Sequence, residues 1–322
     1  MKHKFFVGPP HQKIHSRFIH RLLGGEYVEH PCTTEETNFP DSVLAHDGPD
    51  TIWFFNDIYF HLHPKLKGKQ VFVGHGFGLG WAMTPARVEC LNRYFDSLFE
   101  TGLSPEIKDL ARQGVDPSKI RRTGYTLLFE MPDVPTETKR ILFSITCYLN
   151  FNSDANLEQI LKRLDPALHG SVTVHPELPA DMRDSFRKIC GSKNNLNFIE
   201  SQEELLSEFA RCQCVVGQFS SVVTPFYFQK KPVIFLRGRV ARNPFLGLGW
   251  ARVRRRLGSA LLDQVLDEST KISHWRQFNP KLVEQAKLAP SAQKIFFSSN
   301  YDKEKTSALI REYVRELAVD RA

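Results

Sequence analysis

The feature that most constrains the fold is an alternation of β-rich and helical segments between residues 140 and 236. The apolar runs are short and rich in β-branched and aromatic residues (RILFSITCYL at 140–149, SVTVHP at 171–176, KPVIFL at 231–236). The segments between them carry apolar residues at helical spacing (157–164, 178–191). Strands that alternate with helices form βαβ units. This part of the chain therefore predicts a parallel sheet covered by helices.

The N-terminal half repeats this pattern less regularly. Its strand candidates are apolar runs that end in turns or polar residues (FFVGPP at 5–10, DTIWFFND at 50–57, KQVFVGHG at 69–76, SKIRRTGY at 118–125). Residues 15–25 and 104–114 read as helices, and 94–102 fits either a strand or a helix. Two α/β regions in one chain predict two Rossmann-like domains with a cleft between them.

The length of 322 residues and the 41% hydrophobic content support two domains with sizeable cores. A polar, proline-bearing stretch at 131–139 marks the junction. We predict an N-terminal Rossmann-like domain at 1–134 and a C-terminal Rossmann-like domain at 135–260. Residues 261–322 are expected to form helices that pack back across the domains.

The composition predicts a cytoplasmic protein. The sequence has no run of 18 apolar residues that would predict a transmembrane helix, and its N-terminus lacks the apolar core of a signal peptide. The six cysteines are scattered and lack the paired spacing of zinc ligands. They are best interpreted as small buried hydrophobic residues in a reducing compartment.

The net charge of +7 is concentrated in one segment, because residues 237–256 contain seven arginines and no acid. One interpretation is a solvated basic loop. The other is a surface for an anionic partner such as a phosphate, an acidic lipid or a nucleic acid. No RNP, zinc-finger or helix-turn-helix signature accompanies the arginines, so we expect no nucleic-acid partner.

Ligands of parallel α/β sheets gather at the carboxyl ends of the strands. His75 follows one predicted strand and is flanked by glycines, which let a ligand approach the backbone. It is either a functional residue, acting as a general base or as a hydrogen-bond donor to a phosphate, or a structural loop histidine. His175, at the end of another strand, is equally ambiguous alone.

Ser220 and Ser221 lie where a predicted strand passes into a predicted helix. The first N–H groups of a helix are unpaired and carry partial positive charge, so this junction fits a phosphate. Plain N-capping by serine is the simpler alternative.

The order of these motifs resembles the CDP-glycerol glycerophosphotransferase family, which includes the teichoic acid primases and polymerases. The resemblance spans roughly residues 50–240 and rests on five short motifs in the family's order (VGHG at 73–76, RRTGYT at 121–126, ILFSIT at 141–146, VTVHP at 172–176, GQFSSVV to KPVIFL at 217–236). It implies an α/β, GT-B-like fold: two Rossmann-like domains facing across a cleft, plus C-terminal helices. In such a fold residues 1–134 would be the acceptor-side domain and residues 135–260 the nucleotide-donor domain.

The resemblance also implies roles for single residues. His75 would be the catalytic base, and His175 a second catalytic residue that contacts the donor pyrophosphate. The segment after the strand at 212–217 would bind the donor phosphates (Gly217, Gln218, Ser220, Ser221). Further donor or acceptor contacts are expected at Gly76, Arg122, Gly124, Arg237 and Arg239.

The implied function is a transferase of cell-envelope polysaccharide synthesis that uses CDP-glycerol or CDP-ribitol and releases CMP. The acceptor would be a glycan or a lipid-linked molecule, with the arginine segment at the inner face of an anionic membrane. Because these loops carry no DxD motif, we expect no obligatory metal or other cofactor.

The sequence departs from the family pattern at two acids. Gln218 stands at the first, and Thr224–Phe226 lies where the second is expected. The lysine expected after the HG motif is also missing. These departures leave two alternatives: a GT-B glycosyltransferase that uses CMP-Kdo or CMP-sialic acid, and a catalytically inactive binding protein on the same fold.

Overall fold

The computed structural model describes residues 1–33, 35–73, 84–100, 110–145, 151–176, 178–217, 221–236, 268–296 and 302–319. The chain divides into two units. Unit 1 contains Met1–Glu130 together with Ser298–Ala322, and unit 2 contains Met131–Phe297. The C-terminal segment of the chain thus belongs to the same unit as the N-terminus.

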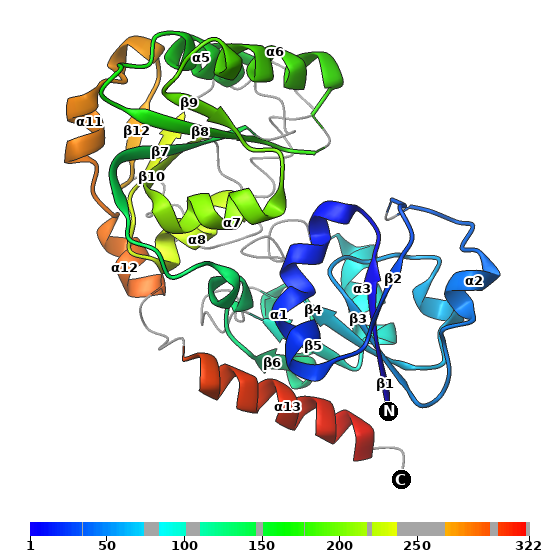
Figure 1. Ribbon diagram of the computed structural model, residues 1–322. Coiled ribbons are helices and arrows are strands. Elements are labelled where there is room, and N and C mark those ends of the chain that lie inside the picture. The colour runs from blue at the N-terminus through cyan, green and yellow to red at the C-terminus, as the bar shows by residue number, and fades with distance from the viewer. Residues whose placement is uncertain are drawn as a thin grey trace. The chain divides into compact units, whose positions relative to one another are not determined.

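Unit 1 is built on a six-stranded parallel sheet in the order β2-β1-β3-β4-β5-β6 (Figure 1). The strands are β1 (Lys2–Val7), β2 (Glu26–Glu29), β3 (Thr51–Phe55), β4 (Lys69–Val73), β5 (Ser97–Glu100) and β6 (Ile120–Arg122). Because all the strands are parallel, their carboxyl ends lie along one edge of the sheet. We call this the carboxyl edge and the opposite one the amino edge.

Helices cover both faces of the unit 1 sheet. They are α1 (Lys13–Leu23), α2 (Asp41–Leu44), α3 (Pro85–Tyr94) and α13 (Lys303–Val319), with short 3-10 turns η1 (Pro10–Gln12), η2 (His63–Lys65), η4 (Pro117–Lys119) and η5 (Thr126–Glu130). Phe54 packs in a core with α1 and α13, whereas its neighbour Phe55 packs in a second core with α3. Successive strand residues point to opposite faces, which is why one apolar strand serves two cores.

Unit 2 repeats the plan with the strand order β12-β11-β10-β7-β8-β9, again all parallel. The strands are β7 (Glu137–Ile145), β8 (His169–Val174), β9 (Leu196–Phe198), β10 (Cys212–Gly217), β11 (Val233–Leu236) and β12 (Thr270–Ile272). The helices are α5 (Phe151–Lys162), α6 (Ala180–Gly191), α7 (Gln202–Arg211), α8 (Thr224–Phe228), α11 (Pro280–Gln285) and α12 (Pro290–Phe296), with 3-10 turns η6 (Ser221–Val223) and η7 (Trp275–Gln277).

The prediction of an α/β fold is confirmed, since both units contain six-stranded parallel sheets. The structure resolves the ambiguous segment 94–102, where Ser97–Glu100 forms β5. It also contains two strands that the sequence does not predict. β2 has four residues and β12 has three, and such lengths are too short to show a period. β12 lies in the stretch from 261 onward that was expected to be helical.

Two glycines make the turn that places β2 beside β1. Gly24 and Gly25 both have positive φ angles, 68° and 131°, in the region that favours glycine. A Cβ at Gly25 would also lie only 2.5 Å from the carbonyl oxygen of His3. The chain therefore leaves α1 and reverses into an edge strand within two residues.

Within the ranges given above, none of the helices combines the length and the apolar character that crossing a bilayer requires.

Candidate functional site

The carboxyl edge of the unit 2 sheet brings together two of the predicted motifs. β10, β7 and β8 are neighbours, with Gly217 opposite Ser144 and Ser144 opposite Thr173. β10 ends at Gly217, and His175 follows directly after β8. The two residues therefore lie at the same edge of the sheet, separated by the end of β7.

His175 is presented by a tightly bonded turn. Its backbone N–H donates to the carbonyl oxygen of Ile145 at 2.8 Å, and its own carbonyl accepts from the N–H of Leu178 at 2.9 Å. Arg183 of α6 donates to the carbonyl oxygens of Pro176 and Leu178, at 2.9 and 3.0 Å. These bonds fix the backbone that carries the half-buried imidazole.

Gly217 is required by packing. A Cβ at this position would lie 2.6 Å from the carbonyl oxygen of Ser144 and 3.1 Å from its Cβ. Such contacts are too close for any side chain. The backbone at the end of β10 therefore packs directly against Ser144 at the end of β7.

The segment that is predicted to bind the donor phosphates continues from Gly217. Gln218 and Ser220 lie outside the described residues, as does the side chain of Ser221. The predicted helix is a 3-10 turn, η6, followed by the five residues of α8. The N-cap of α8 is Val223, so neither serine caps this helix. Such a short helix makes the backbone N–H groups and hydroxyls, rather than a long macrodipole, the groups suited to hold a phosphate.

The carboxyl edge of unit 1 carries the other predicted residues. Arg122 is the exposed last residue of β6, opposite Glu100 in the register. Gly124 has a φ angle of 91°, and its N–H donates to the carbonyl oxygen of Glu100 at 3.1 Å. The turn thus closes over the end of β5. His75 and Gly76, which follow β4, and Arg237 and Arg239, which follow β11, lie outside the described residues.

Two acids at this edge were missed from the sequence. Asp57 follows β3, and Glu100 is the last residue of β5 with a side chain that is almost fully buried. Glu100 comes directly after apolar strand residues and Asp57 comes two positions after the last one, and that location was a signal that could have identified them.

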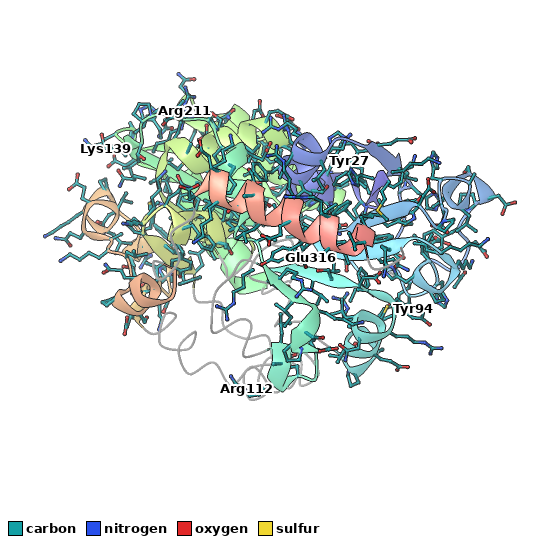
Figure 2. All side chains as sticks on the ribbon, turned by 90° about the horizontal axis from the view of Figure 1, so that it is seen from below. Tyr27, Tyr94, Arg112, Lys139, Arg211 and Glu316 are labelled. Atoms are coloured by element: carbon teal, nitrogen blue, oxygen red, sulfur yellow. The ribbon has the colours of Figure 1, made fainter. Side chains whose placement is uncertain are left out.

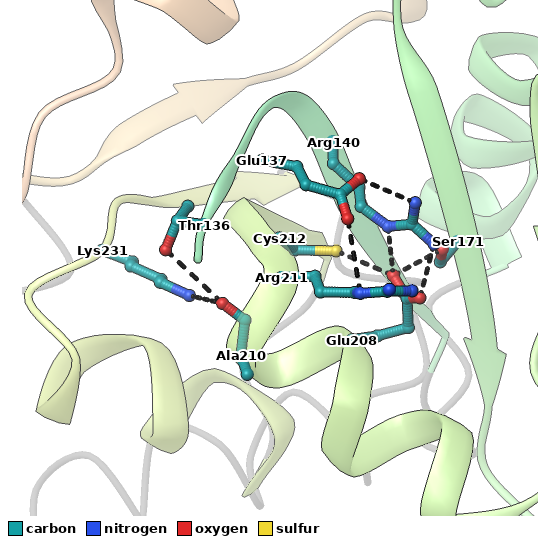
Figure 3. Close-up of polar contacts among 9 residues, drawn as sticks. All are labelled: Thr136, Glu137, Arg140, Ser171, Glu208, Ala210, Arg211, Cys212 and Lys231. Carbon is teal, nitrogen blue, oxygen red and sulfur yellow. Dashed lines mark hydrogen bonds and ion pairs between the residues drawn. The ribbon is translucent and has the colours of Figure 1, made fainter. Parts of the chain in front are cut away.

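The amino edge of unit 2 holds a dense polar network (Figure 3). Glu208 of α7 accepts from Arg140 at 2.8 and 2.6 Å, from Ser171 at 2.7 Å and from Cys212 at 3.3 Å. Burial alone raises the pKa of Glu208, but these donors outweigh burial and lower it. The network lies at the opposite end of the strands from the predicted site, so we interpret it as structural.

Lys231, the lysine of the KP motif, also serves the fold. Its ammonium group donates to the carbonyl oxygens of Phe209 and Ala210 at the end of α7. Figure 3 shows the contact with Ala210. Burial lowers the pKa of Lys231 to about 8. A cation at a helix C-terminus satisfies carbonyl groups that have no partner within the helix.

A cavity of about 300 Å³ lies at the amino ends of β4 and β5 against α13. Its charged groups are paired: Lys69 with Asp96 at 3.0 Å, and Arg121 with Glu316 at 3.8 Å. Figure 2 shows Glu316 on α13. This cavity lies at the opposite edge from the strand ends where ligands of such sheets bind.

The described residues offer neither a metal centre nor a reactive thiol. No group of three or more His, Cys, Asp or Glu side chains in the described ranges is arranged to hold a metal ion. Burial raises the pKa of Cys90 and of Cys214 to about 12. Thiols with such pKa values are not nucleophiles at neutral pH.

No family model matches the sequence, and no curated protein matches it. Solved structures do match. A wall teichoic acid polymerase TagF variant soaked with CDPG gives a TM-score of 0.63 at 15% identity, covering 98% of this chain and 89% of that one.

Two further matches are structures that contain a uridine nucleotide. MnaA of S. aureus with UDP gives a TM-score of 0.57 at 14% identity, over 98% of this chain and 97% of that one. UDP-GlcNAc 2-epimerase of Neisseria meningitidis bound to UDP-GlcNAc gives 0.53 at 12% identity, over 98% and 100%. The likeness shows the fold: the chain is α/β and GT-B-like, with two Rossmann-like domains.

Proposed function

We propose that this protein is a GT-B transferase of cell-envelope polysaccharide synthesis with a cytidine-nucleotide donor, CDP-glycerol or CDP-ribitol. The observation that carries the proposal is the meeting of His175 and Gly217 at the carboxyl edge of unit 2. Each belongs to a motif that resembles the glycerophosphotransferase family. The structural likeness to a TagF variant soaked with CDPG supports the same donor.

The donor diphosphate would lie against the ends of β8 and β10. His175, the backbone after Gly217, and the hydroxyls of Ser220 and Ser221 would donate hydrogen bonds to its oxygens. Hydrogen bonds to a charged group contribute about 1.5–3 kcal/mol each.

In the proposed reaction the acceptor hydroxyl attacks the β-phosphorus of the donor. The bond between that phosphorus and the oxygen bridging to the α-phosphorus breaks, and CMP leaves. His75 would accept the proton of the attacking hydroxyl. The groups around the diphosphate would stabilise the negative charge that develops on CMP.

The acceptor would be a glycan or a lipid-linked molecule, and catalysis would take place in the cytoplasm. The seven arginines of residues 237–256 would contact the anionic inner face of the membrane. A second candidate, sugar transfer from CMP-Kdo or CMP-sialic acid, is favoured by Gln218, which replaces an acid of the glycerophosphotransferase pattern.

The test is donor turnover by the purified full-length chain with a glycerol-phosphate acceptor and a glycan acceptor. We expect CMP release from CDP-glycerol or CDP-ribitol. Release only from CMP-Kdo or CMP-sialic acid would establish the second candidate. Absence of CMP from all four donors, or isomerisation of UDP-GlcNAc, would refute the proposed transfer.

The role of His175 has a matched control on the same strand. The substitution His175→Ala is expected to lower CMP release about a hundredfold, the usual effect of losing one donor to a developing charge. His169 is exposed at the other end of β8, and His169→Ala should stay within twofold. Equal activity of the two variants would remove His175 from the site.

A further inference from the structure

Asp57 is a partly exposed carboxylate at the carboxyl edge of unit 1, two residues after the end of β3. Its side chain is 16% exposed to solvent. Gln12 donates its side-chain N–H to one carboxylate oxygen at 3.2 Å, and the backbone N–H of Ile58 donates to the other at 2.8 Å. The carboxylate is therefore held from two directions.

Gln12 is itself fixed by buried neighbours. The hydroxyl of Tyr59 donates to the side-chain oxygen of Gln12 at 3.1 Å. The side-chain amide of Asn56 donates to the backbone carbonyl oxygen of Gln12 at 2.9 Å. Burial and then the charge of Asp57 raise the pKa of Tyr59, so the phenol remains protonated and can donate. A relay from Tyr59 through Gln12 thus orients Asp57.

The relay extends to β1, the strand beside β3. A Cβ at Gly8 would overlap the hydroxyl of Tyr59, so only glycine fits at the end of β1. The end of β1, the turn η1 and the end of β3 are built around this one hydrogen-bonded chain. Binding groups held in place by such supporting contacts lose less entropy when a ligand arrives.

Asp57 retains acceptor capacity. An ionised carboxylate has about four lone-pair positions, and the described residues fill two of them by hydrogen bonds. Arg87 of α3 approaches to 3.8 Å, beyond hydrogen-bond distance, and its side chain is 27% exposed. A carboxylate beside a guanidinium suits a ligand that presents a hydroxyl next to an anionic group.

We propose that Asp57, oriented by Gln12 and Tyr59, binds a hydroxyl group of the acceptor. Arg87 attracts the acceptor's neighbouring anionic group. This assignment rests on the proposed transferase function, and it names the acceptor subsite: the carboxyl edge of unit 1 at β1 and β3. Asp57 is a binding residue, and Gln12 and Tyr59 are positioning residues.

The test is a kinetic comparison of Asp57→Asn with Asp50→Asn in the full chain. Asp50 precedes β3 at the amino edge, where it is exposed and 3.4 Å from Lys2. With a glycerol-phosphate oligomer as acceptor, we expect Asp57→Asn to raise the acceptor KM at least tenfold. The donor KM should stay within twofold, and Asp50→Asn should change neither. An unchanged acceptor KM, or an equal rise in both KM values, overturns the subsite.

A binding measurement separates this proposal from the proposed function. Titration of the full chain with the same oligomer by calorimetry needs no donor. Binding that Asp57→Asn weakens at least tenfold supports the subsite even if no cytidine donor is turned over. Equal binding by the wild type and both variants, or no binding by the wild type, overturns the subsite even if CMP release is observed.

Discussion

Glu208 at the amino edge of unit 2 and Asp57 at the carboxyl edge of unit 1 are both acids held by several donors, but their surroundings differ. Glu208 is buried and accepts four hydrogen bonds, three on Oε2 and one on Oε1. Asp57 is partly exposed and accepts two hydrogen bonds from the described residues.

The difference shows how a structural acid can be told from a binding acid. Glu208 is buried and its donors all belong to the core of unit 2, so a ligand cannot reach it. Asp57 is held firmly yet keeps open positions, and it lies at the edge of the sheet where ligands bind. The exposure that a carboxylate retains, together with its position along the strand, distinguishes the two acids.

The largest expected effect tests the structural side of this comparison. Arg140→Leu leaves Glu208 as a buried charge without its cation, so we expect a loss of about 3 kcal/mol in the free energy of unfolding. Arg187→Leu is the control. Its partner Glu200 is exposed, and such pairs contribute about 0–1 kcal/mol.

Urea denaturation of both variants measures these losses, and CMP release at low temperature measures activity per folded molecule. We expect Arg140→Leu to retain full specific activity. An Arg140→Leu variant as stable as the wild type would contradict the structural interpretation of the network. So would an Arg140→Leu variant whose specific activity is impaired.

A smaller effect should come from His63, a buried group near the amino edge of unit 1. It accepts from the N–H of Tyr59 at 2.9 Å, and its other ring nitrogen lies 2.7 Å from Gln70. Burial lowers the pKa of His63 to about 3, although the Gln70 hydrogen bond opposes this shift. Between that value and the ordinary pKa of about 6.5, the unfolded chain binds the extra proton.

Stability should therefore fall as the pH falls below 6.5, with His63 costing about 2 kcal/mol between pH 7.5 and 5. His63→Gln should remove this part of the slope, whereas His169→Gln, on the exposed control residue, should keep it. Because the pKa of Glu208 is lowered, its contribution is lost only in stronger acid, below the ordinary pKa of about 4.3. Equal slopes for wild type and His63→Gln would contradict a neutral, buried His63.

Local patterns predict much of the fold. The apolar runs at 140–149, 171–176 and 231–236 coincide with β7, β8 and β11. The spacing of Ser201 and Glu204 predicts a capping box, and the structure contains it at the start of α7. These features depend on residues close in sequence, so sequence analysis can recover them.

The Asp57 relay could not be predicted in this way. Gln12 and Asp57 are 45 positions apart, and they meet because β1 lies beside β3 in the sheet. Strand order is set by long-range packing, which no local period records. The functional roles of His75, His175 and the serine pair remain predictions.

The most direct test of the central claim is a crystal structure of the full chain with CDP. The account predicts the diphosphate at the ends of β8 and β10, with an oxygen within hydrogen-bond distance of His175 and of the backbone after Gly217. A diphosphate bound at the amino edge, for example in the cavity between Lys69 and Arg121, would contradict it.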